Sequence, residues 1–125
     1  MNLGLLKILL LILFLSDESF SEPLQMPYAN FRLLDKISNK LIDKTISVED
    51  LDEIETLSIR VYACFSEPPT EISEDYVLVE IIDNFQDLQK NVYRGWMISS
   101  SPEVTALEHP IYDLWLLGCI NDKTS

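Results

Sequence analysis

The chain has 125 residues, which suffices for one domain, and its 9 basic and 21 acidic residues give a formal net charge of −12. A surface this acidic repels phosphate backbones, which excludes nucleic acid as an expected partner. It also disfavours anionic membrane surfaces, whereas basic partners would be attracted.

The first 21 residues predict a secretory signal peptide. The amino terminus and Lys7 give a positive end, and an unbroken apolar run follows from Ile8 to Leu15. Ser19 and Ser21 then form an S-x-S cleavage site, with no nearby cysteine for a lipid anchor. The run is shorter than the about 20 residues that cross a bilayer. Extension through Leu3 to Leu6 leaves an uncleaved anchor as an open alternative.

Cleavage after residue 21 leaves residues 22–125, with 8 basic and 19 acidic residues and a net charge of −11. We expect this product in the periplasm or cell envelope, not integral to the membrane if the signal is cleaved. Residues 22–30 contain Pro23 and Pro27 without hydrophobic periodicity, which predicts a linker. Residues 31–120 form a single predicted domain, and 121–125 a tail.

The first half of the domain predicts three extended segments. Phe31 to Val48 favours two of them, and the acidic stretch Glu49 to Glu55 favours a turn or loop. Leu57 to Phe65 is the clearest strand, ended by Pro68-Pro69. Its alternation assigns residues to two faces: Leu57, Ile59, Val61, Ala63 and Phe65 on one, and Ser58, Arg60, Tyr62 and Cys64 on the other.

The second half continues with strands at Tyr76 to Ile82 and Val92 to Ile98, joined by the polar connection Asp83 to Asn91. Ile111 to Cys119 is apolar throughout except for Asp113, which predicts a strand buried on both faces. Short strands separated by turn signals indicate a mostly β fold, a small antiparallel β-sandwich or barrel-like domain with one short helix.

That helix is expected inside the stretch from Gly95 to Cys119. Ser101 can cap a helix that starts at Pro102, because proline is favoured at the first helical position. His109 precedes Pro110, which forces it into an extended conformation and ends the helix.

Cys64 and Cys119 both belong to the mature domain. In an exported protein an even count favours a disulfide, with two separate buried thiols as the alternative. Closing a loop of about 56 residues would stabilise the fold by roughly 4 kcal/mol.

A serine, a histidine and an acid invite a hydrolase hypothesis: Ser99, Ser100 or Ser101 as nucleophile, with His109 and Asp113. No G-x-S-x-G motif surrounds any serine, and Ser101 and His109 have the structural roles given above. His109 and Asp113 stay as weak catalytic candidates. Asp113 is also expected to pair with a cation or with backbone amides, and the candidate partners are Arg60, Arg94 and His109.

Neither metal nor cofactor is expected. The chain has one histidine, and a disulfide would consume both cysteines. Asp50-x-Asp52 resembles the start of a calcium loop, but the turn glycine and closing glutamate are missing, which favours a solvated acidic loop. Trp96 and Trp115 are interpreted as core residues.

Several short motifs occur together: Gly95-Trp96-Met97, Ser100-Ser101-Pro102, Glu108-His109-Pro110-Ile111-Tyr112-Asp113-Leu114-Trp115, Cys119, Leu34-Asp35-Lys36 and Ala63-Cys64. In combination they resemble an uncharacterised family of exported alphaproteobacterial proteins, domain of unknown function 2155. The resemblance spans about residues 31–120. It implies export, a single domain and a cysteine pair, and it supplies no activity.

Two functional hypotheses follow. The first is a non-enzymatic domain of the cell envelope that binds an envelope protein or another envelope component, or supports envelope assembly. The second is a small envelope hydrolase that uses His109 and Asp113 with a nearby serine.

Overall fold

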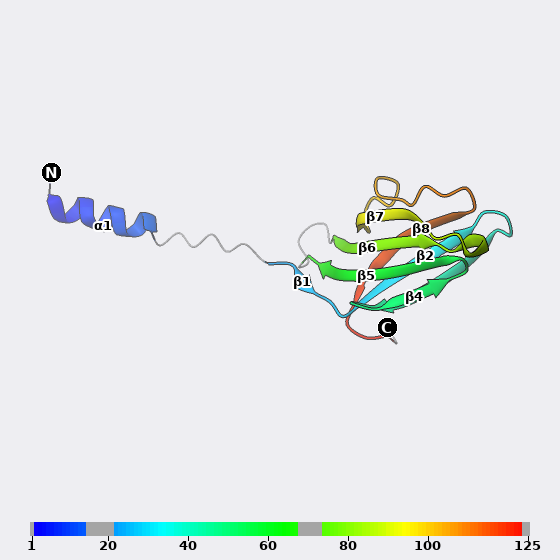
Figure 1. The fold of residues 1–125 in the computed structure, drawn as a ribbon. Helices are drawn as coiled ribbons and strands as arrows, with labels where there is room; N and C mark the ends of the chain where they lie inside the picture. The colour runs from blue at the N-terminus through cyan, green and yellow to red at the C-terminus, as the bar shows by residue number, and fades with distance from the viewer. Residues whose placement is uncertain (1, 15–21, 68–73, 124–125) are drawn as a thin grey trace.

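The computed structural model describes residues 2–14, 22–67 and 74–123. The predicted cleavage residues Ser19 and Ser21, and Pro68-Pro69, lie outside this part. The described chain forms one α-helix, a short 3-10 helix (η1) and eight strands, as Figure 1 shows. Their bounds are α1 Leu3–Phe14, β1 Leu24–Gln25, β2 Tyr28–Asp35, β3 Lys40–Ser47, β4 Leu51–Ile54, β5 Leu57–Ser66, β6 Asp75–Asp83, η1 Phe85–Asp87, β7 Lys90–Ile98 and β8 Tyr112–Ile120.

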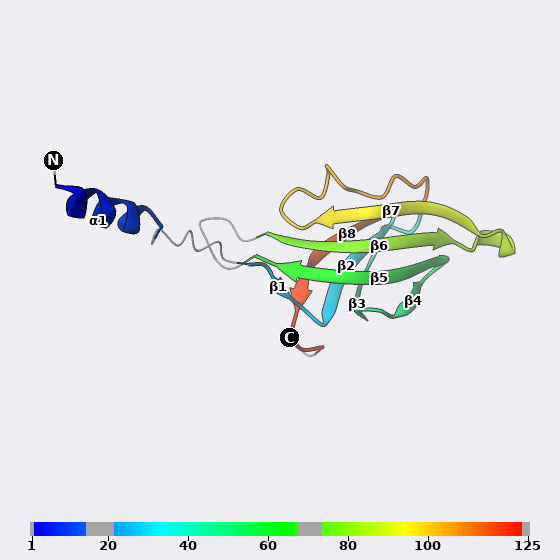
Figure 2. The ribbon, with the colours of Figure 1, turned by 60° about the vertical axis from the view of Figure 1, so that its left-hand side comes forward.

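The strands form two antiparallel sheets. The first has five strands in the order β1-β5-β6-β7, with β4 also paired to β5. The second has three strands in the order β3-β2-β8. Figures 1 and 2 show the sheets face to face with their strands crossing. This arrangement confirms the mostly β, sandwich-type fold.

One hydrophobic core lies between the sheets, because alternate residues of each strand point inward. On β2 these are Ala29, Phe31 and Leu33, each with no exposed surface. The other fully buried members come from both sheets and from the loop before β8: Ile46, Leu57, Ile59, Val61, Val77, Val79, Ile81, Met97, Leu107, Leu114 and Leu116. Apolar burial of this kind is the main term that stabilises the fold.

Single-residue β-bulges interrupt the alternation in β5, β7 and β8; in β7 the extra residue is Val92, because Ile81 pairs with Tyr93 and Ile82 with Asn91. Tyr62 is the extra residue in β5, because Val61 pairs with Val79 and Ala63 with Leu78. Leu117 is the extra residue in β8, where the pairing partner jumps from Leu116 to Gly118. Beyond a bulge, the side chains that face the core are shifted by one position.

The bulge in β5 corrects the predicted faces of this strand. Strict alternation would place Phe65 inside and Cys64 outside. In the structure Cys64 has no exposed surface and joins the core, while Phe65 is on the outer face.

The strand β8 is also less buried than expected. Tyr112, Leu114 and Leu116 are in the core, but Asp113 and Trp115 alternate with them on the partly exposed outer face. Strand β8 lies at one edge of its sheet and pairs only with β2 on the path given above. No described element covers its outer face as helices cover both faces of a parallel sheet.

Two segments predicted as irregular contain strands. Within residues 22–30, expected to be a linker, β1 pairs with the end of β5 and β2 begins at Tyr28. Within the acidic stretch, Leu51 to Ile54 pairs with Leu57 to Arg60. In both cases, backbone pairing with a long neighbouring strand outweighs weak local propensity.

The helix expected from Pro102 is absent: residues 101–111 form turns and irregular structure in the described chain. The Val104 amide donates to the Ser101 carbonyl at 3.0 Å, which closes a single turn. Thr105 Oγ1 accepts the Ile98 amide at 3.0 Å, and Leu107 is buried in the core. These two contacts fix Thr105 and Leu107 in positions that a continuing helix would not give them. A single turn without further hydrogen bonds is not a stable helix.

The helix α1 lies apart from the sandwich (Figure 1). It is apolar apart from Lys7, and its leucines are exposed, with Leu3 at 77%. Among the described helices, none is long and apolar enough to span a membrane.

Candidate functional site

The histidine of the predicted catalytic set, His109, is a buried structural residue. Its side chain is 5% exposed, and its Nε2 atom lies 2.7 Å from Asp83 Oδ2 at the end of β6. Its Nδ1 atom accepts the amides of Ile111 at 3.0 Å and Tyr112 at 3.2 Å. Because Nδ1 accepts two N–H groups, the proton of the neutral ring is on Nε2, which donates to Asp83.

This geometry shifts the carboxyl group of Asp83. Burial opposes its ionisation, but hydrogen bonds from His109, Thr56 and the Phe85 amide more than offset that effect. The pKa of Asp83 therefore lies below its usual range. The acid that bonds the histidine is Asp83, whose side chain is 15% exposed and which lies in the stretch predicted to be a polar connection.

Asp113, the expected acid, lies on the outer face of β8 and pairs with a cation that was not among the candidates. Its Oδ1 atom is 3.4 Å from Lys36 Nζ, and its side chain is 43% exposed. Lys36 Nζ also donates to the His109 carbonyl at 2.7 Å, and the Lys36 amide donates to the Ile111 carbonyl at 2.8 Å. Lys36 thus ties the turn after β2 to the loop before β8.

Within the described chain, none of the three serines forms a hydrogen bond with His109. Ser99 Oγ accepts the Asp75 amide at 3.1 Å, and Ser100 Oγ donates to Glu74 Oε2. Ser101 contributes its carbonyl to the turn with Val104. The serines therefore build the junction between β7 and the start of β6.

The hydrolase hypothesis lacks its required geometry. A general base needs a ring nitrogen within hydrogen-bond reach of the nucleophile, and both nitrogens of His109 already have partners. Asp113 is on the opposite face of its strand from the core and bonds Lys36 instead of the histidine.

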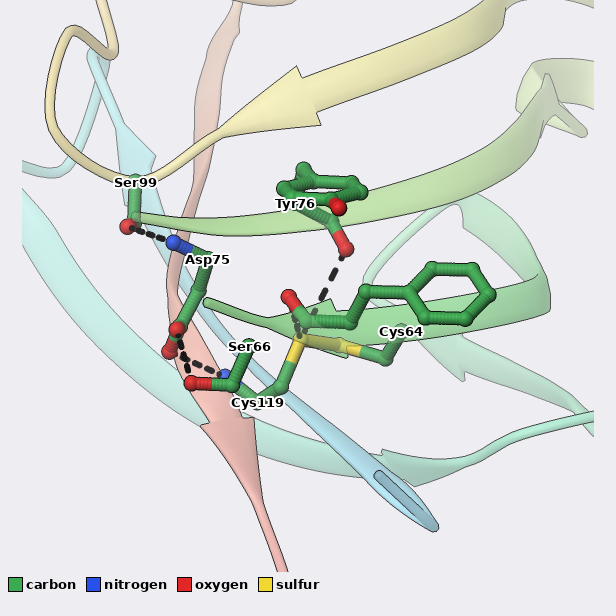
Figure 3. Close-up of a disulfide and its surroundings, with 7 residues drawn as sticks. Cys64, Ser66, Asp75, Tyr76, Ser99 and Cys119 are labelled. Carbon is green, nitrogen blue, oxygen red and sulfur yellow. Dashed lines mark hydrogen bonds between the residues drawn. A yellow bond between two sulfur atoms is a disulfide. The ribbon is translucent and has the colours of Figure 1, made fainter. Parts of the chain in front are cut away.

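The two cysteines form a disulfide that joins the sheets. Cys64 on β5 and Cys119 on β8 have Cα atoms 5.8 Å apart, within the range for a disulfide. Cys64 has no exposed surface and Cys119 is 6% exposed. The disulfide therefore lies inside the core and links strands of opposite sheets (Figure 3).

Asp75 connects three strands beside this disulfide. Its Oδ1 atom accepts the Ser66 hydroxyl at 2.6 Å, and its Oδ2 atom accepts the Cys119 amide at 2.9 Å (Figure 3). Its backbone carbonyl accepts the Ser99 amide at 2.9 Å. A carboxylate that satisfies donors from β5 and β8 at once fixes the spacing of the two sheets.

The outer face of the five-stranded sheet carries a cluster that we call the aromatic face: Phe65, Tyr76, Leu78, Trp96 and Ile98. Its members come from three neighbouring strands, since Tyr76 pairs with both Phe65 and Ile98, and Leu78 pairs with Trp96. The ring centroids of Tyr76 and Trp96 are 5.6 Å apart, and those of Phe65 and Tyr76 are 5.7 Å apart. Trp96 is 44% exposed, which corrects its interpretation as a core residue.

Trp96 points outward because it alternates along β7 with Met97, which is buried in the core. Gly95 has φ of 152°, a conformation that side-chain-bearing residues rarely adopt. Tyr93 Cε1 lies 4.0 Å from the position that a Gly95 Cβ atom would take, and the Tyr93 hydroxyl donates to the Trp96 carbonyl at 2.6 Å. The second tryptophan, Trp115, is partly exposed on the outer face of the other sheet and is not in the core either.

No metal centre is evident: within the described residues, no group of three histidine, cysteine or acidic side chains could hold an ion. Of the two acids in the suspected calcium motif, Asp52 pairs with Lys44 Nζ at 3.2 Å. Asp50 donates its amide to the Ser47 carbonyl at 3.1 Å in the turn before β4.

A family model matches residues 29–119, and its description is "Uncharacterized protein conserved in bacteria (DUF2155)". The chain belongs to this family. The match spans both sheets and includes the two cysteines, Asp75, Asp83 and His109. It confirms the resemblance seen in the sequence and identifies the chain as an uncharacterised conserved bacterial domain.

A curated relative agrees with this family. The chain is 28% identical over 64 residues to an uncharacterised protein of Rickettsia prowazekii (strain Madrid E). That alignment covers 50% of this chain and 41% of the relative. No solved structure matches the chain.

Sequence reasoning missed Asp75, Asp83 and the aromatic face for one physical reason. The role of each depends on partners in other elements of the fold, so local spacing in the sequence does not indicate it. One signal was present: Asp75 and Asp83 stand at the two ends of an apolar strand, where a carboxylate can reach the ends of neighbouring elements.

Proposed function

We propose that this protein is an exported, disulfide-bonded domain of the cell envelope that binds another envelope component and does not catalyse a reaction. The observation that carries the proposal is the Cys64–Cys119 disulfide, buried between the sheets. Disulfides persist in oxidising compartments such as the bacterial periplasm and are rare in the cytosol.

The amino-terminal segment supports export. The helix α1 has 12 residues, and its apolar side chains are exposed instead of packing on the sandwich. A positively charged end followed by a short apolar segment is what the secretion machinery recognises. The helix adds no contact that the sandwich needs, so its removal by cleavage is compatible with the fold.

The binding role is supported by a contrast between the polar side chains, which bond within the fold, and the aromatic face. His109 and Asp113, the two weak catalytic candidates, both serve the fold: His109 bonds Asp83 and two amides, and Asp113 on β8 bonds Lys36. Within the described residues, the side chains of the partly exposed aromatic face form no such hydrogen bonds or ion pairs, and Trp96 is 44% exposed. Large aromatic side chains on a rigid sheet are the residues that dominate protein interfaces.

The test is to express the full chain with a carboxyl-terminal tag and fractionate the cells. We expect the protein in the periplasmic fraction, beginning at Glu22, with neither cysteine alkylated before reduction. The matched control lacks residues 2–21; it stays in the cytoplasm, and its thiols are alkylated. Full-length protein that is retained in the cytoplasm with free thiols would contradict the proposal.

Binding is tested in the same cells. Chemical cross-linking in the periplasm, followed by capture through the tag, is expected to recover a reproducible envelope component. Hydrolysis of envelope polymers or esters that is abolished by His109→Ala without loss of folded protein would instead support the hydrolase hypothesis.

A further inference from the structure

We propose that the aromatic face docks a lysine- or arginine-bearing segment of a partner protein. This inference rests on the proposed binding function and names the chemistry of the partner. The face is defined above as Phe65, Tyr76, Leu78, Trp96 and Ile98.

The face has the composition and rigidity of a binding surface. Its three rings stand on β5, β6 and β7, which pair along their lengths, so their positions are set before a partner arrives. The Phe65 and Trp96 centroids are 6.2 Å apart, which completes a continuous apolar surface. Exposed aromatic clusters on a soluble domain mark interaction sites more often than isolated apolar residues do.

Two carboxylates border one end of this face. Glu67 follows β5 and Glu74 precedes β6, and the Glu67 amide donates to the Glu74 carbonyl at 2.9 Å. Neither carboxylate forms an ion pair with any described cation, although Glu74 accepts the amide and hydroxyl of Ser100. Burial, and then the negative charge of Glu67, raise the pKa of the Tyr76 hydroxyl.

The opposite border of the face carries cations. Arg94 Nη2 lies 2.7 Å from Glu80 Oε2, so the single carboxylate at this border already has a cationic partner, and the Arg94 side chain is 74% exposed. Arg60 stands across the strand pair from Glu80 on the same face. Approaching cations are therefore directed to the Glu67 and Glu74 end, where lysine or arginine can also lie over the faces of Tyr76 and Trp96.

The negative charge of Glu67 and Glu74 favours one kind of partner for the aromatic face over the others. A second copy of the cleaved chain, with its net charge of −11, would bring another Glu67 and Glu74 against the same border. Anionic lipid headgroups and acidic proteins meet the same repulsion. A basic protein segment satisfies both the aromatic surface and its unpaired carboxylates.

The protein for this experiment is purified from cells that express the full chain. In a Trp115→Phe background, Trp96 is the remaining tryptophan and reports on the face by fluorescence. The probe is a short lysine-rich peptide, and the same peptide with glutamate in place of lysine is its counterpart. We expect saturable quenching with the lysine peptide, weakening as salt is raised, and none with the glutamate peptide.

Variants separate the aromatic and acidic contributions, with affinity measured by calorimetry where Trp96 is changed. Trp96→Ala and Tyr76→Ala are each expected to weaken binding by about tenfold. The double change Glu67→Gln and Glu74→Gln is expected to reduce the salt dependence. Matched controls are Phe85→Ala, a residue 52% exposed at the other end of the sheet, and the double change Glu53→Gln and Glu55→Gln on β4 and the turn after it.

The outcomes are distinguishable. Equal affinity of wild type and Trp96→Ala, or equal binding of the glutamate peptide, would overturn the inference. So would concentration-dependent dimerisation that Trp96→Ala abolishes, because a second copy would then occupy the face. If an envelope component is captured equally well by wild type and Trp96→Ala, this inference fails and the proposed function survives. If no component is captured by either, the proposed function fails.

Discussion

A Cβ atom placed on Gly118 would lie 2.9 Å from Oδ2 of Asp75. Real Cβ atoms do not come this close to an oxygen, so the hydrogen at Gly118 is what leaves room for the carboxylate. That carboxylate holds the Ser66 hydroxyl and the Cys119 amide, beside the disulfide. Glycine on β8 and aspartate on β6 therefore form one structural unit across the two sheets.

Gly118→Ala is expected to destabilise the protein by about 1–2 kcal/mol, because the added methyl group displaces a carboxylate that two hydrogen bonds fix. Denaturant unfolding of the oxidised protein measures the loss. In an Asp75→Ala background the same change should cost about 1 kcal/mol less, since the crowded oxygen is gone. Equal cost in both backgrounds would show that the two residues do not interact.

Replacing both cysteines by alanine is expected to lower the free energy of unfolding by about 4 kcal/mol, because the cross-link no longer restricts the unfolded chain. Alanine is chosen since serine would bury a hydroxyl group in the core. Thermal unfolding of the variant, compared with wild type under oxidising and reducing conditions, measures the effect. Reductant should bring wild type toward the variant and leave the variant unchanged; any response of the variant would point to another cause.

Substitutions at His109 can separate its two hydrogen-bonding roles. Asn is expected to keep an acceptor near the Nδ1 position for the amides of Ile111 and Tyr112, and Gln to keep a donor near Nε2 for Asp83. Because an unsatisfied buried donor costs about 1–3 kcal/mol, we expect His109→Gln to destabilise more than His109→Asn. Chemical denaturation ranks the two variants, and the reverse order would contradict the geometry described here.

The depressed pKa of Asp83 predicts a pH dependence of stability. A carboxyl group whose pKa is lower in the folded state stabilises the fold above its unfolded pKa of about 3.9, and this contribution is lost as pH falls below that value. Asp83→Asn should therefore be less stable than wild type at neutral pH, with a difference that shrinks under acid conditions. Unfolding free energies from neutral to acidic pH test this. A difference that widens on acidification would reverse the sign of the argument.

Asp113→Asn is expected to change stability by less than about 1 kcal/mol, because its pair with Lys36 is at the surface and solvent screens it. Thermal unfolding at low and high salt is a sufficient measurement. A loss of several kcal/mol would mean that Asp113 is the buried acid first expected from its apolar surroundings.

Much of the sandwich could be predicted from local pattern. β-branched and alternating residues identified β5, β6 and β7, because these strands lie side by side in the larger sheet and each packs one face on the core. Short elements were harder. The two-residue β1 has no pattern of its own and exists because the end of β5 offers it unpaired backbone groups.

Alternation in the sequence predicts which side chains point into the core only up to the β-bulge of each strand that has one. A bulge adds one residue without changing composition, so alternation in the sequence misplaces everything beyond it. This is why Cys64 was expected outside and Phe65 inside. The roles of the polar residues depend on contacts between distant parts of the sequence in the same way. His109 bonds Asp83 at the end of β6, 26 residues away, and not the nearby Asp113.

The bulges in β5 and β8 also constrain how the sequence of this protein can evolve. The extra residue at Tyr62 brings Cys64 into the core, and the extra residue at Leu117 does the same for Cys119. A descendant that deleted either residue alone would keep one thiol inside and turn the other outward, where neither could reach its partner. The two insertions, far apart in the gene, are therefore expected to be inherited or lost together, and a relative with one insertion should lack the cysteine pair.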